Sequence, residues 1–330
     1  MSGTEGATFR VRAGLDEAGY GPLLGPLTIG YSAFRCAAGR DVDWPRLDAA
    51  VTAEPRSDAT HIVVADSKKV FTRNPRGERR LETAALTFLR AAGRDVDSGL
   101  DLVAAAPCGL APDGALLARH PWYGELPASL PHRVSAEELA TRSSKLDATL
   151  GDAGVEVADA GVVVVPAGAL NDSFANTSNK GATLWSFNSG VIAHLFERFG
   201  DEGLDLTVDR RGGRARDGRQ RSALIPFSVV RVVAESSFES RYLVEAQGRT
   251  MAIRFVQKGD RDSLPVALAS CLAKYARELV MGAFNEHFGA LYPAVAPTAG
   301  YVTDARRWLN EVSQERPDAL PNRDDLVRSR

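Results

Sequence analysis

The sequence has little cysteine and no long hydrophobic run. Its 330 residues include three cysteines, Cys36, Cys108 and Cys271, which form no CxxC pair and have no histidine nearby at ligand spacing. This scarcity argues against a zinc site or a disulfide framework and favours a reducing, cytoplasmic compartment. No apolar stretch reaches the length of about 18 residues that a membrane-spanning helix needs, and the first residues, MSGTEGATFRVRAG, lack the apolar core of a signal peptide. We therefore expect no membrane partner.

An excess of charge of one sign is also lacking. Lys and Arg number 40 and Asp and Glu number 42, which gives a formal net charge of −2. Proteins that coat nucleic acid are usually basic, so this balance argues against that class. It leaves room for an enzyme with a local basic groove around an acidic site. Because 44% of the residues are apolar, a chain of this length can bury a large core.

Hydrophobic periodicity predicts strands and helices in the first half of the chain. In FRVRAGLD, apolar residues alternate from Phe9 to Leu15, which predicts a strand that ends at Asp16. PLTIGYSAF predicts a second strand, close enough to form a hairpin with the first. The apolar run HIVVADSKKVF breaks into a polar turn, GERRLETAALTFLRAAG has helical spacing, and DLVAAAP indicates a further strand.

The second half of the chain has stronger signals. Ser135 opens a Ser-x-x-Glu capping box, so a helix is expected to begin there. VVVVPAGALNDSF predicts a buried strand followed by a loop, and GATLWSFNSGVIAHLFERFG predicts a helix that ends at Gly200. A strand is predicted for LDLTVDRRGG, and a hairpin is predicted for SRYLVEAQ and TMAIRFVQ. The strongest helix signal is that of SLPVALASCLAKYARELVMGAFNEHFG. A short helix around DARRWLNEV and a solvated tail, DALPNRDDLVRSR, complete a pattern that indicates an α/β fold with a mixed sheet.

The stretch AGLDEAGYGPLLGPL places two adjacent acids and a glycine-rich turn at the end of the first strand. Gly19, Gly21 and Gly25 superficially resemble a dinucleotide fingerprint, but that motif needs a helix whose free backbone N–H groups meet the pyrophosphate. Pro22 and Pro26 remove N–H groups, and the following residues alternate like a strand. The pattern therefore favours part of a metal site, because carboxylates at strand ends hold Mg²⁺ or Mn²⁺.

A metal site of this kind needs more than two acids. Asp16 and Glu17 supply the first two, and the candidates for the others are Asp209 at the end of LTVD and Glu278 in the strongest helix. Each acid also has a structural alternative. Asp209 could cap a strand, and Glu278 could be a solvated helix residue paired with Lys274 four positions earlier.

Several motifs resemble those of type 2 ribonuclease H (bacterial ribonuclease HII). GLDEAGYGPLLGP resembles the DEAGRGP…GP opening of the family, and DSKKV resembles its DSK turn. LTVDRRGGR stands where the family has a strand ending in V-D-G, VQKGDRDSLPVALASCLAKYAREL resembles KGD…AASxxAKVxRD, and YP…GYVT resembles YP…GYxT. The motifs occur in the order of the family from Asp16 to Thr303, which argues against a chance resemblance.

The resemblance implies a ribonuclease H-like α/β fold, with a central mixed β-sheet flanked by helices and a two-metal site. Position by position, the implied catalytic and metal-binding acids are Asp16, Glu17, Asp209 and Glu278. The implied catalytic domain spans residues 1–290. We interpret residues 109–155 as an insertion because the interval before the third acid is long, and residues 291–330 as a C-terminal helical extension that carries the GYxT motif.

Two positions depart from the type 2 pattern. Glu278 stands where that branch usually has Asp, and Glu, which keeps the charge and adds one methylene, is typical of the sister type 3 enzymes. Tyr20 stands between Gly19 and Gly21, where type 2 enzymes have Arg and type 3 enzymes have Lys. The glycines preserve the backbone contacts that the family makes near the ribonucleotide 2′-OH, but the positive side chain is lost.

The resemblance also implies which residues contact the substrate: Gly19, Tyr20, Gly21, Lys68 in DSKKV, and Tyr301, which in the family lies near the sugar at the junction. Lys68 could equally be a solvated turn residue, and Tyr301 a core tyrosine. The run DRRGGRARDGRQR has six arginines and two aspartates. It would suit the phosphate backbone of a duplex, or it is an ordinary solvated loop.

The expected function is that of a metal-dependent endonuclease that uses Mg²⁺ or Mn²⁺. It would cleave the RNA strand of RNA/DNA hybrids, or cut at ribonucleotides embedded in duplex DNA, and leave 5′-phosphate and 3′-hydroxyl ends. We expect a monomer. Two alternatives stay open: a catalytically impaired homologue that binds nucleic acid, and a ribonuclease H-fold nuclease that acts on another duplex structure. A mere binder would gain nothing from acids that face phosphates.

Overall fold

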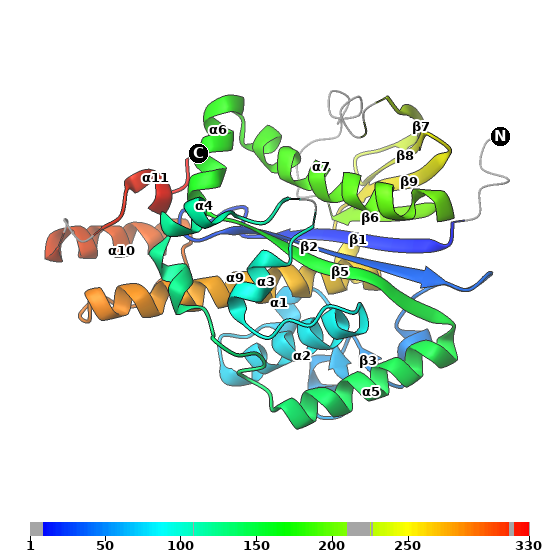
Figure 1. Ribbon diagram of the computed structural model, residues 1–330, viewed down its shortest axis with the longest axis horizontal. Helices are drawn as coiled ribbons and strands as arrows, with labels where there is room; N and C mark the ends of the chain where they lie inside the picture. Colours follow the sequence, from blue (N-terminus) through cyan, green and yellow to red (C-terminus); the bar gives the residue numbers. More distant parts are fainter. Residues whose placement is uncertain (1–8, 108, 210–224, 226, 317–319, 330) are drawn as a thin grey trace.

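A seven-stranded mixed sheet forms the centre of the protein (Figure 1). The computed structural model describes residues 9–107, 109–209, 225, 227–316 and 320–329. The strand order is β5-β2-β1-β6-β9-β8-β7. The strands are β1 (Val11–Ala18), β2 (Leu27–Cys36), β5 (Val155–Val165), β6 (Leu204–Asp209), β7 (Val229–Glu235), β8 (Glu239–Ala246) and β9 (Arg249–Val256). The arginine-rich run after Asp209 lies outside the described residues.

The sheet has an antiparallel half and a parallel half that meet at β1. Strand β2 is antiparallel to both β1 and β5, whereas β6 is parallel to both β1 and β9. Strands β9, β8 and β7 then continue as an antiparallel meander. The two predicted hairpins are present, and the predicted α/β class with a central mixed sheet is confirmed.

Helices cover both faces of the sheet (Figure 1). On one face lie α9 (Leu264–Leu291), α2 (Pro75–Ala91) and α5 (Ala136–Ala153), whose apolar residues share a core with β2 and β5. On the other face lies α7 (Lys180–Phe199), which packs on the apolar residues of β1, β6 and β9. The remaining helices are α1 (Ser67–Val70), α3 (Gly99–Ala104), α4 (Gly114–Ala118), α6 (Ala167–Thr177), α10 (Val302–Glu315) and α11 (Arg323–Leu326).

Helix α9 lies unusually close to the sheet because small residues line the contact. A Cβ atom added at Gly14 would stand 2.2 Å from the carbonyl carbon of Pro265, and one at Gly30 would stand 2.0 Å from the carbonyl oxygen of Ala269. Any larger side chain would push the helix away from the sheet. These glycines therefore fix the position of the helix that carries Glu278.

Helix predictions at strong signals are confirmed. Ser135 caps α5, because its side chain accepts a hydrogen bond from the Glu138 N–H, and α7 ends before Gly200 as expected. Three weaker predictions are wrong. DLVAAAP is not a strand, because Ser98 caps helix α3 there; the expected loop after VVVVP is helix α6; and the tail is not simply solvated, because α11 buries Leu326.

Residues 109–155, the interval interpreted as an insertion, contain α4, the 3-10 turn Pro121–Glu125 and α5. Trp122 from this interval packs against Phe284 and Phe288 of α9, with ring centroids 5.3 and 5.6 Å apart. A second, two-stranded sheet of β3 (Val51–Thr52) and β4 (Ile62–Val63) adjoins α2. Among the described helices, none is both long and apolar enough to cross a membrane.

Candidate active site

The ends of strands β1 and β6 place two of the predicted acids side by side. The strands are parallel neighbours, and Leu15 lies opposite Val208. Asp16 and Asp209 are the next residues on their strands. Since residues in register on paired strands point to the same face, these two carboxylates are neighbours on one face of the sheet, near the carboxyl ends of two central strands.

Backbone N–H groups already hold two of these carboxylates. The Oδ1 atom of Asp16 accepts a hydrogen bond from the Glu17 N–H at 2.7 Å, and the Oδ1 atom of Asp209 accepts one from the Gly259 N–H at 2.8 Å. Asp16 and Glu17 are 5% and 2% exposed. The acids are therefore built into the end of the sheet rather than set on its surface.

Two further acids, Asp66 and Asp260, stand close to this strand end. Burial, and then the charges of Asp66 and Asp209, raise the pKa of Asp260 to about 6, although Lys68 pulls it down. Asp66 also caps α1, since its side chain accepts a hydrogen bond from the Lys68 N–H at 3.0 Å. The exposed side chain of Lys68 thus stands within the electrostatic reach of the site.

Helix α9 carries its second half beyond the end of β1. The Thr28 hydroxyl of β2 donates a hydrogen bond to the carbonyl oxygen of Ala273 at 2.8 Å. Thr28 is the partner of Ala18, the last residue of β1. Arg277 and Glu278, one turn further along α9, therefore lie past the strand end that carries the acids.

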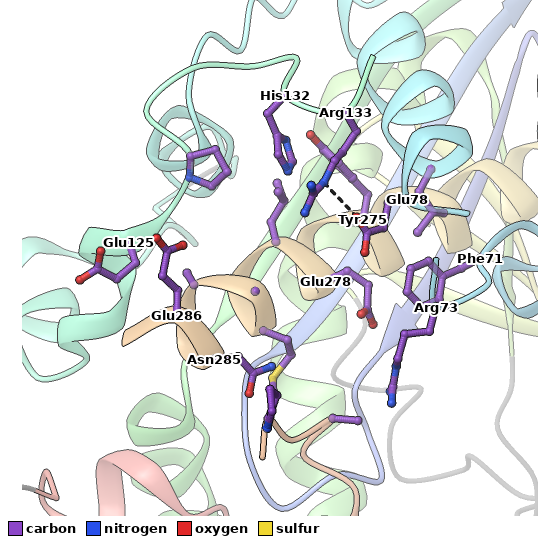
Figure 2. A pocket seen from close by; sticks show the side chains of 18 of the residues that line it. Phe71, Arg73, Glu78, Glu125, His132, Arg133, Tyr275, Glu278, Asn285 and Glu286 are labelled. Carbon is purple, nitrogen blue, oxygen red and sulfur yellow. Dashed lines mark ion pairs between the residues drawn. The ribbon is translucent and has the colours of Figure 1, made fainter. Parts of the chain in front are cut away.

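Glu278 points into a cavity of about 390 Å³, and none of Asp16, Glu17 and Asp209 lines this cavity (Figure 2). Its carboxylate forms an ion pair with Lys274 on the same helix, which is the structural alternative that the sequence allowed. Tyr301 lines the same cavity and is 51% exposed. Tyr301 is thus not a core tyrosine, and it shares one hollow with the predicted fourth acid.

Arg277 ties the glycine-rich turn that runs from Gly19 to Pro26 to α9. Gly19 has a φ of +87°, a conformation that favours glycine. Arg277 is 1% exposed, and it donates hydrogen bonds to the carbonyl oxygens of Pro26 at 2.8 Å and Ala299 at 3.1 Å. Its guanidinium carbon lies 5.9 Å from the centroid of the Tyr301 ring. One buried arginine therefore joins the glycine loop to the tyrosine motif.

The donor chemistry of this site fits a hard divalent cation. Carboxylate oxygens are the ligands that Mg²⁺ and Mn²⁺ prefer. Burial is the first cause of the raised pKa of Asp260, and the negative charges of Asp66 and Asp209 raise it further, a repulsion that a cation would relieve. Over the residues that the structure describes, however, no three His, Cys, Asp or Glu side chains are grouped closely enough to hold a metal ion.

Sequence reasoning missed three residues around the site. Asp66 and Asp260 were available in the motifs DSKKV and KGD, but only the lysine of the first motif was considered. Arg277 was hidden because it directly precedes Glu278 in a helix judged by its apolar stripe. Its role depends on three chain segments that meet only in the folded protein.

No family model matches the chain, and no curated protein matches it. Solved structures that resemble it include a chain of the PCNA:RNase HII complex from Archaeoglobus fulgidus, with 16% identity, 97% of this chain and 94% of that chain covered, and a TM-score of 0.44. Ribonuclease H2 from Pyrococcus horikoshii OT3 is 15% identical, with 94% of this chain and 90% of that chain covered and a TM-score of 0.36. Bst-RNase HIII in complex with Mn²⁺ is 12% identical, with 96% of this chain and 65% of that chain covered and a TM-score of 0.43. With identities of 16% or lower and TM-scores of 0.44 or lower, the likeness assigns no activity or residue role to this chain.

Proposed function

We propose that this protein is a metal-dependent endonuclease of the ribonuclease H type. It cleaves the RNA strand of RNA/DNA hybrids, or cuts at ribonucleotides embedded in duplex DNA, and leaves 5′-phosphate and 3′-hydroxyl ends. The observation that carries the proposal is the adjacency of Asp16 and Asp209 at the ends of paired parallel strands. The sequence motifs, which follow the order of the ribonuclease H family, support it.

The metal ions are Mg²⁺ or Mn²⁺, and Asp16, Glu17, Asp209 and Glu278 would hold them. When bound, two such ions activate water for attack on phosphorus and stabilise the leaving 3′-oxygen. Lys274 competes with a cation for the carboxylate of Glu278 because the two side chains form an ion pair.

The substrate contacts the glycine loop and Tyr301, the two segments that Arg277 connects. Gly19, Tyr20 and Gly21 supply contacts on one side and Tyr301 on the other, and the exposed Lys68 contributes a positive charge near the acids. Bases stack on aromatic rings, and phosphates attract lysine, so this combination suits a nucleic-acid strand. The protein acts as a monomer in the cytoplasm.

The proposal is tested by cleavage of two labelled duplexes with Mg²⁺ or Mn²⁺. One is a continuous RNA/DNA hybrid, and the other carries a single ribonucleotide in DNA. Asp16→Asn should lower the rate on the order of a thousandfold, since the metal chemistry that it weakens is worth several kcal/mol. Asp147→Asn, the same change at an exposed position of α5, is the control and should cut at the wild-type rate.

The two duplexes also separate the substrate classes. Cutting of the single-ribonucleotide duplex would assign recognition of a junction, and cutting of the hybrid alone would assign recognition of longer RNA tracts. Equal rates for Asp16→Asn and the wild type, or no metal-dependent cutting of either duplex, would overturn the proposal.

A second candidate function is favoured by one observation. The carboxylate of Glu278 forms an ion pair with Lys274, as expected for a homologue that binds hybrid without cleaving it. Binding of the labelled hybrid without metal-dependent cutting would select this function over the nuclease.

A further inference from the structure

Tyr20 lies beneath a lysine that comes from a distant part of the chain. The Nζ atom of Lys180 lies 4.7 Å from the centroid of the Tyr20 ring, which is within the distance of about 6 Å for a cation–π interaction. Lys180 is the first residue of α7, and Asn179 caps this helix by accepting a hydrogen bond from the Ala182 N–H at 3.0 Å. The cap fixes the backbone from which the lysine extends.

Arg328 fixes the backbone of the same loop. Its guanidinium donates hydrogen bonds to the carbonyl oxygens of Gly19 and Tyr20, and its backbone N–H donates to the carbonyl oxygen of Leu23 at 2.9 Å. Asn171 of α6 anchors this C-terminal segment, because its Nδ2 donates to two carbonyl oxygens within residues 324–327 at 2.6 and 2.8 Å. These hydrogen bonds therefore fix the backbone of the loop that carries the Tyr20 ring.

Arg328 and Lys180, the cations that reach the loop from the C-terminal segment and from α7, have different exposure. Arg328 is 7% exposed and is directed at loop carbonyl groups, so it is placed to hold the loop rather than to meet a ligand. Lys180 is only partly buried, and it lines a narrow pocket with Tyr20. An ammonium over a ring face can still donate to a phosphate because it carries three N–H donors.

The loop itself offers no positive charge. The residues from Gly19 to Gly25 are GYGPLLG, without lysine or arginine. They follow directly on Asp16 and Glu17, so a phosphodiester brought to the strand ends would meet negative charge first. A cation beside the loop would offset that repulsion, and Lys180 stands there on the ring of Tyr20.

We propose that Lys180, seated on Tyr20, contacts a backbone phosphate of the nucleic-acid substrate. The pair supplies from α7 the positive charge that the glycine loop lacks, while the ring of Tyr20 holds the ammonium in place. This inference rests on the proposed function, since it names a further substrate-binding residue of the same site.

The salt dependence of binding tests this inference. Affinity for the labelled RNA/DNA hybrid is measured by fluorescence anisotropy in EDTA, so that no cleavage occurs, at several salt concentrations. Each phosphate contact contributes about 0.9 to the slope of log K against log salt, so Lys180→Gln should make the slope shallower by about one. Lys145→Gln, on the exposed face of α5, should leave the slope unchanged.

Two further variants show whether the position of the charge is what matters. Lys180→Arg should keep the wild-type slope. Tyr20→Arg combined with Lys180→Gln should restore it, because the double variant moves the cation from α7 into the loop. A mere loss of packing in Lys180→Gln would not be repaired by this exchange.

The outcomes separate the two proposals. A wild-type chain that binds and cuts a duplex, with the slope of Lys180→Gln equal to that of the wild type, overturns this inference alone. A shallower slope that the double variant fails to restore overturns it as well. A wild-type chain that neither binds nor cuts either duplex overturns the proposed function and this inference together.

Discussion

Glu82 and Asp260 are both acids whose side chains are at least partly buried, but their pKa values are shifted in opposite directions from the ordinary values of such groups. Burial raises the pKa of Glu82, but hydrogen bonds from His132 and from the Arg133 N–H outweigh burial and leave it lowered. Burial also raises the pKa of Asp260, and there the charges of Asp66 and Asp209 raise it further. The first acid is surrounded by donors, and the second by other acids.

Glu82 joins three segments of the chain. It is fully buried on α2, and its two carboxylate oxygens accept hydrogen bonds from the backbone N–H groups of His132, Arg133 and Val134 at 3.2, 2.6 and 2.8 Å. The hydroxyl of Tyr275 on α9 donates to the same carboxylate at 3.1 Å. Such an acid stabilises the fold because every lone pair has a donor.

Asp159 of β5 is, like Glu82, a buried acid surrounded by hydrogen-bond donors. It is 1% exposed, and it accepts hydrogen bonds from Arg94 at 2.7 Å, from Arg198 at 3.1 Å and from the ring of His194 at 3.0 Å. Burial raises its pKa, yet His194 and Arg94 lower it by more. Glu82 and Asp159, which accept hydrogen bonds from several donors, therefore stabilise the fold. The acids at the ends of β1 and β6 lie near one another instead, an arrangement that suits a cation.

The loss of activity in Asp16→Asn is the largest expected effect. The largest expected effect on stability is that of Glu82→Ala. Removing this carboxylate leaves buried N–H groups without an acceptor, which should lower the free energy of unfolding by about 3–5 kcal/mol. Chemical denaturation measures the change. Glu197→Ala, at an exposed position of α7, should change it by about 0.5 kcal/mol or less. A similar cost for both variants would erase the distinction between the two groups of acids.

Asp159→Asn should be less severe, because the amide keeps the shape and an acceptor. We expect a loss of about 1.5–3 kcal/mol in the free energy of unfolding at pH 7, the usual worth of hydrogen bonds to a charged group. Since the pKa of Asp159 is lowered on folding, its stabilisation is present above its unfolded pKa and disappears as the pH falls through its folded pKa. The difference between variant and wild type should therefore shrink below pH about 4. A constant difference from pH 7 to pH 3 would contradict this account.

Asp260→Asn should have the smallest effect, with the opposite sign. Because the pKa of Asp260 is raised to about 6 on folding, its ionisation opposes folding progressively as the pH rises from about 4 to 6, and the cost is complete above that window. In EDTA at pH 8, the variant should be more stable than the wild type by at most about 1 kcal/mol, since solvent screens a half-buried group. At pH 3 the two should coincide. Asp262→Asn, an exposed neighbour, is the matched control, and a destabilised Asp260→Asn at pH 8 would contradict the assignment.

Local signals in the sequence were enough for much of the fold. The alternation from Phe9 to Leu15 specified β1, the Ser135 capping box specified the start of α5, and the long apolar pattern specified α9. They failed where the signal was short. DLVAAAP is too small and too rich in alanine to distinguish a strand from a helix, and the cap at Ser98 decides for the helix.

Residue types and their spacing are enough to identify the side chains that could carry chemistry. Two adjacent acids at a strand end, two glycines around Tyr20 and the later motifs are written in the chain, because residue type and spacing along one strand or helix are local properties. The candidate acids can therefore be identified from the sequence without any distance.

The surroundings of those residues depend on the folded arrangement of the chain. Asp209 stands beside Asp16 through strand register, Arg277 joins the glycine loop to the tyrosine motif, and Lys180 rests on Tyr20 although 160 residues separate them in the numbering. Burial, charge and hydrogen-bond partners depend on contacts between distant segments. Local sequence patterns carry no information about such contacts until the chain has folded.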